Sequence, residues 1–276
     1  MECTRTIPLA ALALIATVGC ASDVFVDDLG EGEGDTGSTD LASLCTTGAA
    51  EGAPPTPADI VIAMDNSGGM DDEAALVQEH LPEFLSGLRR AGVDARITLI
   101  TSPFPGTEER EKNGICLPAP EGSGACPDDS NPPLYVHVPA VIESRDALSV
   151  IADTHGQWRA RLREGADVHF LLISDDNADD TAADFIGWMA DATPPLTDFH
   201  FHTISASQDK RIACEADPLS PCCTFAAREG TVYRELAELT DGTWSDFCDH
   251  DFWASFEAIS AAIVLLSCSF ENVPVG

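Results

Sequence analysis

The chain has 276 residues, 44% of them hydrophobic, so it is long enough to bury one substantial core. Its 47 acidic residues against 14 basic ones give a formal net charge of −33. So few cations cannot neutralise a phosphate backbone, which excludes nucleic-acid binding, whereas the acidic surface attracts divalent cations without specificity. We therefore expect an extracytoplasmic protein, or one from a salty or cation-rich setting.

The N-terminus has the pattern of an export signal. Residues 1–19 hold an apolar run from Ile7 to Val18 that is too short to span a bilayer, which predicts a signal peptide. Cys20, within "VGCA", resembles the cysteine of a bacterial lipobox, which becomes the lipid-carrying N-terminus after cleavage. Residues 20–58 are acidic and rich in Gly, Ser, Thr and Pro, which predicts a lipidated flexible tether. We expect a cell-envelope protein, anchored to a membrane by lipid alone and by analogy at the outer membrane; secretion is the alternative.

Ten cysteines are present, of which Cys3 would leave with the signal peptide and Cys20 would carry lipid. An even number in an exported chain predicts about four disulfides. Cys116 and Cys126 are the best local pair, and the other pairings stay open. A zinc site is the alternative, although no pair has CxxC spacing. The eight remaining cysteines are Cys45, Cys116, Cys126, Cys214, Cys222, Cys223, Cys248 and Cys268.

The rest of the chain alternates apolar runs with amphipathic segments. Runs typical of buried strands occupy residues 59–64, 94–102, 134–138, 167–174, 198–207 and 242–247. Helical spacing occurs at 71–90, 145–165, 179–189, 233–239 and 252–266. This alternation predicts an α/β fold with a doubly wound, mostly parallel central sheet that is flanked by helices and stapled by disulfides. Residues 103–133 are too long for an ordinary connection and predict a functional or protective loop, and 271–276 are a short C-terminal tail.

Polar residues follow two of the predicted strands. Residues 65–67, "DNS", come after the first strand, and 174–177, "SDDN", end the central one. Ligands of open α/β sheets bind at the carboxyl ends of the strands, so both segments are expected on one rim. Two acidic strand ends on one rim favour a cation site with oxygen ligands.

These segments resemble a known family. "DIVIAMDNSGGM" followed by a long helix, and later "VHFLLISDDN", are similar to the first and last metal-binding segments of the von Willebrand factor type A (vWA) domain. "GTWSDFC" and "FWASFEAIS" match the way that domain closes, so the resemblance covers roughly residues 59–270. It implies a D-x-S-x-S motif, a hydroxyl from a second loop and an aspartate from a third that together hold Mg²⁺ or a similar ion. An acidic group of a partner protein completes the coordination.

Residue by residue, the resemblance implies Asp65 and Ser67 as the first two motif positions and Asp175 as the third-loop aspartate. Gly69 stands where the motif has a second serine, so one hydroxyl ligand is missing. Water, or the carboxylates that follow the motif, can replace it. The supporting carboxylates are Asp71, Asp72 and Asp176.

The second-loop hydroxyl matches no motif. We assign it to Ser144, because the helix that this serine would cap precedes a parallel strand and so begins at the rim. Thr154 is the alternative. His200 and His202 lie on one face of a strand, where we expect a semi-exposed sheet face rather than a metal site, because no third ligand is in view.

These features predict a non-catalytic, lipid-anchored binding or adhesion module. It presents a cation-dependent face, with Mg²⁺, Mn²⁺ or Ca²⁺, to a protein or cell-surface ligand. One alternative is a metal-free scaffold, in which Asp65 caps a helix and Asp175 and Asp176 form a solvated turn. A remote alternative is a Mg²⁺-dependent phosphohydrolase, which needs a lysine near the phosphoryl group; the chain offers Lys112 and Lys210, both in loop-like contexts.

Overall fold

The computed structural model describes residues 55–102 and 113–268. Within them, six strands form one sheet in the order β3-β2-β1-β4-β5-β6, and every neighbouring pair is parallel. The strands are β1 (Ala58–Met64), β2 (Ala95–Thr101), β3 (Tyr135–Pro139), β4 (Asp167–Ser174), β5 (His200–Ser205) and β6 (Trp244–Asp246). The prediction of a doubly wound α/β fold is confirmed.

The central strand β1 is buried along its whole length, which its unbroken apolar run predicts. Alternate side chains enter two separate cores. Ile60 and Ile62 belong to the core on one face of the sheet, and Val61 and Ala63 belong to the core on the other. Both faces of the sheet are therefore covered.

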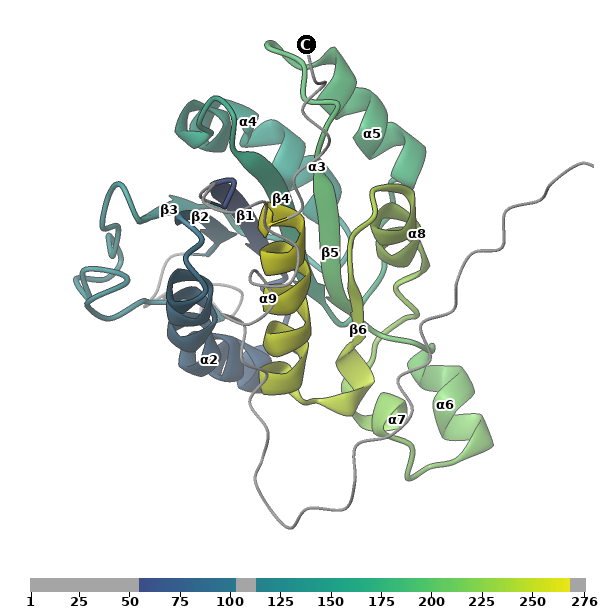
Figure 1. Cartoon of the computed structure of the whole chain (residues 1–276). Helices are drawn as coiled ribbons and strands as arrows, with labels where there is room; N and C mark the ends of the chain where they lie inside the picture. The colour runs from purple at the N-terminus through teal and green to yellow at the C-terminus, as the bar shows by residue number, and fades with distance from the viewer. Residues whose placement is uncertain (1–54, 103–112, 269–276) are drawn as a thin grey trace, which may run out of the picture. The chain divides into compact units, whose positions relative to one another are not determined.

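Helices α2 (Asp71–Arg90) and α9 (Phe252–Cys268) cover the first face, where they lie side by side (Figure 1). Phe84 of α2 and Phe256 of α9 join them, with ring centroids 5.3 Å apart. The second face carries α3 (Ala147–Asp153), α4 (His155–Trp158), the 3₁₀ turn η2 (Arg159–Arg161), α5 (Ala182–Asp191) and α8 (Thr231–Leu239). Across the described ranges, no helix is long and apolar enough to cross a membrane.

One predicted helix is divided. The sequence predicts a single helix over 145–165, but α3 ends at Asp153 and a new turn begins at His155. Thr154 lies at the break, where its hydroxyl donates to the carbonyl of Val150 at 2.7 Å. A hydrogen bond from a threonine hydroxyl to the carbonyl four residues earlier competes with the backbone hydrogen bonds of the helix. The spacing of apolar residues does not predict such a break.

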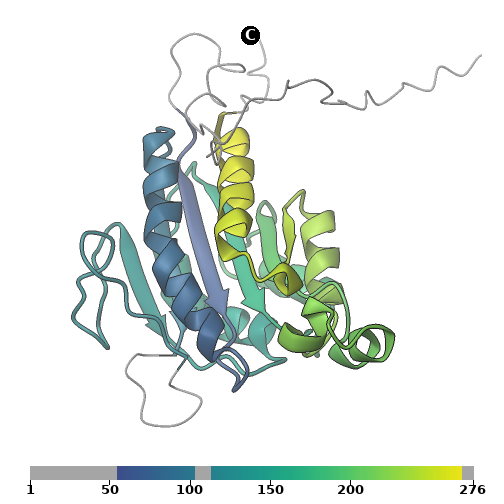
Figure 2. The same cartoon turned by 90° about the horizontal axis from the view of Figure 1, so that it is seen from below.

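The cysteine-rich segment forms two short helices that the sequence analysis left as loop, α6 (Lys210–Ala216) and α7 (Pro221–Phe225). Together with the turn η3 (Phe247–Asp249), they lie beyond the carboxyl ends of the strands (Figures 1 and 2). The adjacent Cys222 and Cys223 bond to different partners, Cys248 and Cys214. Cys116–Cys126 forms as predicted, and Cys268 is also disulfide-bonded. A zinc site is not favoured, because both candidate ligand groups that contain cysteine use disulfide sulfurs.

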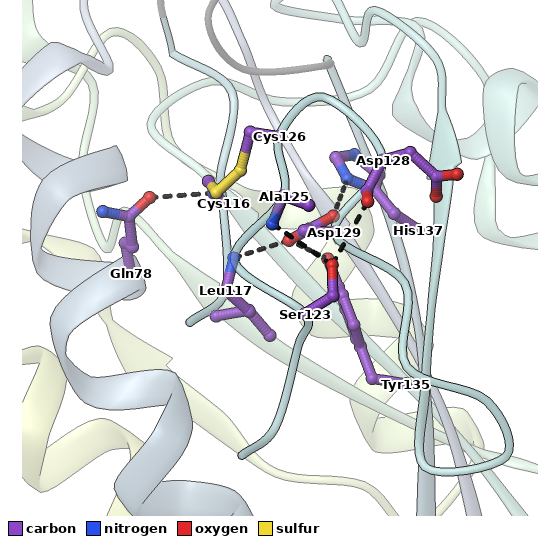
Figure 3. Close-up of a disulfide and its surroundings, with 10 residues drawn as sticks. All are labelled: Gln78, Cys116, Leu117, Ser123, Ala125, Cys126, Asp128, Asp129, Tyr135 and His137. Carbon is purple, nitrogen blue, oxygen red and sulfur yellow. Dashed lines mark hydrogen bonds and ion pairs between the residues drawn. A yellow bond between two sulfur atoms is a disulfide. The ribbon is translucent and has the colours of Figure 1, made fainter. Parts of the chain in front are cut away.

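The described part of the long loop is held against the edge of the sheet by one buried carboxylate (Figure 3). Asp129 is 0% exposed and accepts from the Leu117 amide, from the Tyr135 hydroxyl at 3.1 Å and from His137 Nδ1 at 2.8 Å. The other nitrogen of His137 faces the Thr101 carbonyl at 3.2 Å. The ring of His137 therefore lies between the loop and the end of β2.

His169 of β4 and His202 of β5 form a buried pair within the sheet. His202 is 0% exposed, so the expectation of a semi-exposed face is wrong for it. Its Nδ1 accepts from the Thr243 amide at 3.0 Å, which leaves the proton on Nε2 to be donated to His169 Nδ1 at 3.1 Å. Burial and the neighbouring His200 lower the pKa of His202 to about 3. Because Nε2 of His202 carries a proton, His202 and His169 form a hydrogen bond between neutral rings and not a metal site.

Several predictions concern residues outside the described ranges: the signal peptide at 1–19, lipidation at Cys20, most of the tether and the tail at 271–276. The last residues assigned to the tether contact the folded part, since the Thr56 amide donates to the Ser267 carbonyl at 2.8 Å. β1 begins at Ala58, one residue before the predicted domain boundary.

Candidate functional site

The site lies where β1 and β4 end side by side. The two strands are parallel and in register, with Met64 opposite Ile173. The next residues, Asp65 and Ser174, therefore meet at the same edge, and the Asp65 amide donates to the Ile173 carbonyl at 3.0 Å. The two acidic segments that the sequence placed on one rim are indeed neighbours.

Asp65 is completely buried. One carboxylate oxygen accepts from the Ser67 amide at 2.7 Å, which closes the turn after β1, and the other accepts from the Ser174 hydroxyl at 2.8 Å. Desolvation raises the pKa of Asp65, and these hydrogen bonds oppose that rise. The helix-cap interpretation is wrong, since α2 begins after Met70 without a side-chain cap.

Asp175 is 8% exposed, so the solvated-turn interpretation is wrong. Its main-chain carbonyl accepts from the amides of Ala227 and Arg228, at 2.8 and 3.1 Å. Its carboxylate oxygen Oδ1 is buried and has no hydrogen-bond partner among the residues the structure describes. Burial, followed by the charges of Asp65, Asp176 and Glu73, raises the pKa of Asp175 to about 7.

Gly69 faces this carboxylate. A Cβ atom at position 69 would lie 3.3 Å from Asp175 Oδ2, whereas one at Gly68 would meet nothing within 4 Å. Position 69 therefore lies next to the carboxylate of Asp175. A side chain at position 69 would therefore need a small shift of the Asp175 carboxylate.

The loop before α3 brings Ser144 to the same rim. Ser144 lines a cavity of about 210 Å³ that opens between the two loops. The other lining residues are Asn66, Ser67, Gly68, Val141, Ile142 and Glu143. The expectation that Ser144 caps the helix is wrong: Asp146 is the N-cap residue, and its carboxylate accepts from the Glu143 amide at 2.8 Å. The alternative, Thr154, uses its hydroxyl inside the helix.

The supporting carboxylates differ in their surroundings. Asp71 and Asp72 are exposed on the first turn of α2. Asp176 is buried; its carboxylate accepts from the Asn177 amide at 2.7 Å and lies 3.7 Å from the Arg228 guanidinium. Asp176 is therefore the only one of the three that is buried beside Asp175, and the exposed pair faces solvent.

Asn66 organises the rim, a role that the residue patterns did not reveal. Its amide nitrogen donates to the Thr101 hydroxyl at 2.7 Å, and its oxygen accepts from the amides of Ser102 and Ile142, at 2.9 and 3.1 Å. One buried side chain thus joins the loops that follow β1, β2 and β3. Its partners lie 35 to 76 residues away in sequence, so no local pattern could show them.

The site has the chemistry of a cation site. Buried carboxylates lie next to one another, one of their oxygens lacks a partner within the described ranges, and serine hydroxyls stand in the same loops. A hard divalent ion would relieve the repulsion between the carboxylates and occupy the free oxygen. Among the described residues, however, the groups of three or more acidic, histidine or cysteine side chains with converging ligand atoms all contain cysteine, and none of them lies at this rim. A cation at the rim therefore stays a prediction.

Comparison with known proteins does not assign the chain to a family. No family model matches the chain, and no curated protein sequence matches it. The class that the fold defines is that of doubly wound α/β proteins with an acidic rim. The resemblance to vWA domains rests on the sequence segments alone and stays a prediction.

Proposed function

We propose that this chain is a lipid-anchored extracytoplasmic binding module of the vWA type, whose rim presents a divalent cation to a protein or cell-surface ligand. The observation that carries the proposal is the buried carboxylate of Asp175: its Oδ1 has no hydrogen-bond partner among the described residues, and its Oδ2 lies beside position 69. A carboxylate in that position is destabilised without a cation and stabilised with one.

The surface around the site supports recognition of a partner. Ser67 is half-buried, and Gly68 and Gly69 are exposed, so an acidic group of another molecule can reach an ion held beneath them. Val141 is an apolar side chain at the mouth of the cavity beside Ser144 and is 36% exposed.

Calorimetric titration of the full-length protein with Mg²⁺, Mn²⁺ and Ca²⁺ tests the proposal. We expect one site for at least one of these ions and loss of binding in Asp65→Ala. Asp191→Ala is the matched control, because it removes an exposed carboxylate at the end of α5 and is expected to bind as the wild type does. If the wild type binds none of the three ions, the cation-dependent module is ruled out.

Gly69 supports a second candidate, a scaffold whose interaction face works without metal. The glycine removes one ligand of the motif, and the buried carboxylates can share protons instead, since the pKa of Asp175 is raised to about 7. A pull-down with and without chelator separates the two candidates. Partners of a scaffold stay bound in chelator, whereas partners of a cation-dependent face are released.

A further inference from the structure

We propose that the edge at which the strands begin, opposite the rim, holds a second site, in which Arg96 and Arg161 bind a phosphate group. Arg96 is the second residue of β2, and Arg161 ends the turn η2. The ligand is either free phosphate or the phosphate of a lipid headgroup. The site does not depend on the proposed rim cation, because the two sites lie at opposite ends of the strands.

The two arginines line one cavity. It has a volume of about 120 Å³ and lies between the first residues of β1 and β2 and the turn η2. The apolar part of its wall comes from Ile60, Ile97, Pro133, Val136 and Leu162. A charged group beside such a wall interacts more strongly with a counter-charge than it would in water, because the local dielectric constant is lower.

The guanidinium groups of Arg96 and Arg161 form no hydrogen bond or ion pair within the described ranges. In a chain with 47 acidic and 14 basic residues, such isolation is unusual. Arg159, in the same turn as Arg161, also lacks a carboxylate partner there and adds to the positive charge. The other described arginines each form an ion pair, namely Arg89, Arg90, Arg145, Arg163, Arg211, Arg228 and Arg234.

The carboxylate in the cavity wall does not supply the missing counter-charge. Asp59 is 2% exposed, and its carboxylate accepts from Arg163 Nε at 2.9 Å and from the Arg163 amide. Asp94, which also pairs with Arg163, is exposed and does not line the cavity. The cavity therefore keeps the positive charge of Arg96 and Arg161.

Thr98 adds an uncharged donor to the same cavity. It lies two residues after Arg96 in β2, so both side chains are on one face of the sheet. Thr98 is 4% exposed, and its hydroxyl has no hydrogen-bond partner in the part of the chain that is described. Guanidinium groups match the oxygens of a phosphate group, and a hydroxyl can donate one more bond. A carboxylate has only two oxygens for these three donor groups, which favours phosphate.

Calorimetric titration of the full-length protein with inorganic phosphate, in chelator and at constant ionic strength, tests the proposal. The chelator removes any rim cation that could itself bind phosphate. We expect Arg161→Gln and Arg96→Gln each to weaken phosphate binding at least tenfold. Arg161 is exposed, so its replacement should leave the fold intact, which circular dichroism checks. Arg211→Gln is the matched control, because Arg211 is an exposed arginine of α6, and a change below twofold is expected.

A second titrant, glycerophosphoglycerol, separates the two sources of phosphate, since it is a lipid headgroup without acyl chains. Tighter binding of this compound than of inorganic phosphate assigns the site to a membrane headgroup, and the reverse order assigns it to free phosphate. The proposal is overturned if wild type binds neither titrant at millimolar concentration. It is also overturned if folded Arg161→Gln and Arg96→Gln bind both titrants as wild type does.

Discussion

Asp129 and Asp175 are both buried carboxylates, yet their surroundings are opposite. Asp129, in the disulfide-bonded loop, contacts an amide, a hydroxyl and a histidine, and both of its oxygens have partners. Asp175, at the rim, lies among other carboxylates and has one oxygen without a partner in the residues described. Burial alone therefore does not mark a functional carboxylate. A carboxylate with partners stabilises the fold, whereas one without a full set of partners among like charges is a candidate for a functional site.

The largest loss of stability is expected when Asp129 is replaced, since both of its carboxylate oxygens have partners. Asp129→Ala removes the hydrogen-bond partner of His137, Tyr135 and the Leu117 amide, and each buried donor left without an acceptor costs about 1–3 kcal/mol. Urea unfolding monitored by circular dichroism measures the loss. The exposed neighbour gives the control, Asp128→Ala, for which a change within about 0.5 kcal/mol is expected. Equal stability of the two variants would show that the loop is not anchored by Asp129.

Removing the charge of Asp175 should instead raise the free energy of unfolding, because one of its oxygens has no partner in the described residues. The pKa of Asp175 is 3.8 in the reference state and about 7 in the folded protein, so between these values the folded protein binds the extra proton. Its contribution to stability is therefore lost as the pH rises from about 4 to about 7. Asn does not titrate. In chelator, Asp175→Asn should gain about 2–4 kcal/mol relative to wild type over that range.

Urea unfolding of wild type and Asp175→Asn at several pH values checks this prediction. Saturating Mn²⁺ should reverse the order of stability, because only wild type keeps the carboxylate that the ion stabilises. A constant difference between the two proteins from pH 4 to pH 8 would mean that Asp175 is ionised throughout and balanced by other groups.

The smallest expected effect is a change in cation affinity when Gly69 is replaced. Gly69→Ser restores the hydroxyl of the motif next to Asp175, where its Cβ fits at 3.3 Å from Oδ2 with a small adjustment. We expect cation affinity to rise about fivefold to tenfold, or about 1 kcal/mol. Calorimetric titration measures it. Gly68→Ser is the control, since its side chain would meet nothing within 4 Å and should leave affinity unchanged. Equal affinities for the two variants would place the ion away from position 69.

Much of the rim was predictable from local sequence. Asp65 and Asp175 follow the two longest apolar runs that become the central strands, and parallel strands bring such ends to one edge. Ser144 was placed at the rim by the same argument, although Asp146 begins the helix. The cap was misassigned because the chain makes a further turn after Ser144, in which the Asp146 carboxylate accepts from the Glu143 amide, and the helix begins after Asp146 without a side-chain cap.

The sequence by itself determined the order of elements, the parallel sheet and the place of the two acidic loops, because hydrophobic periodicity and turn residues are local properties. Only the tertiary structure decided which carboxylates have partners. Asp129 and Glu73 look like ordinary charged residues in a loop and in a first helical turn. Both are buried, Asp129 in contact with His137 and Glu73 in contact with His250. The second contact spans 177 residues of sequence. Whether a buried charge is balanced depends on such distant neighbours, so it is settled when the chain folds.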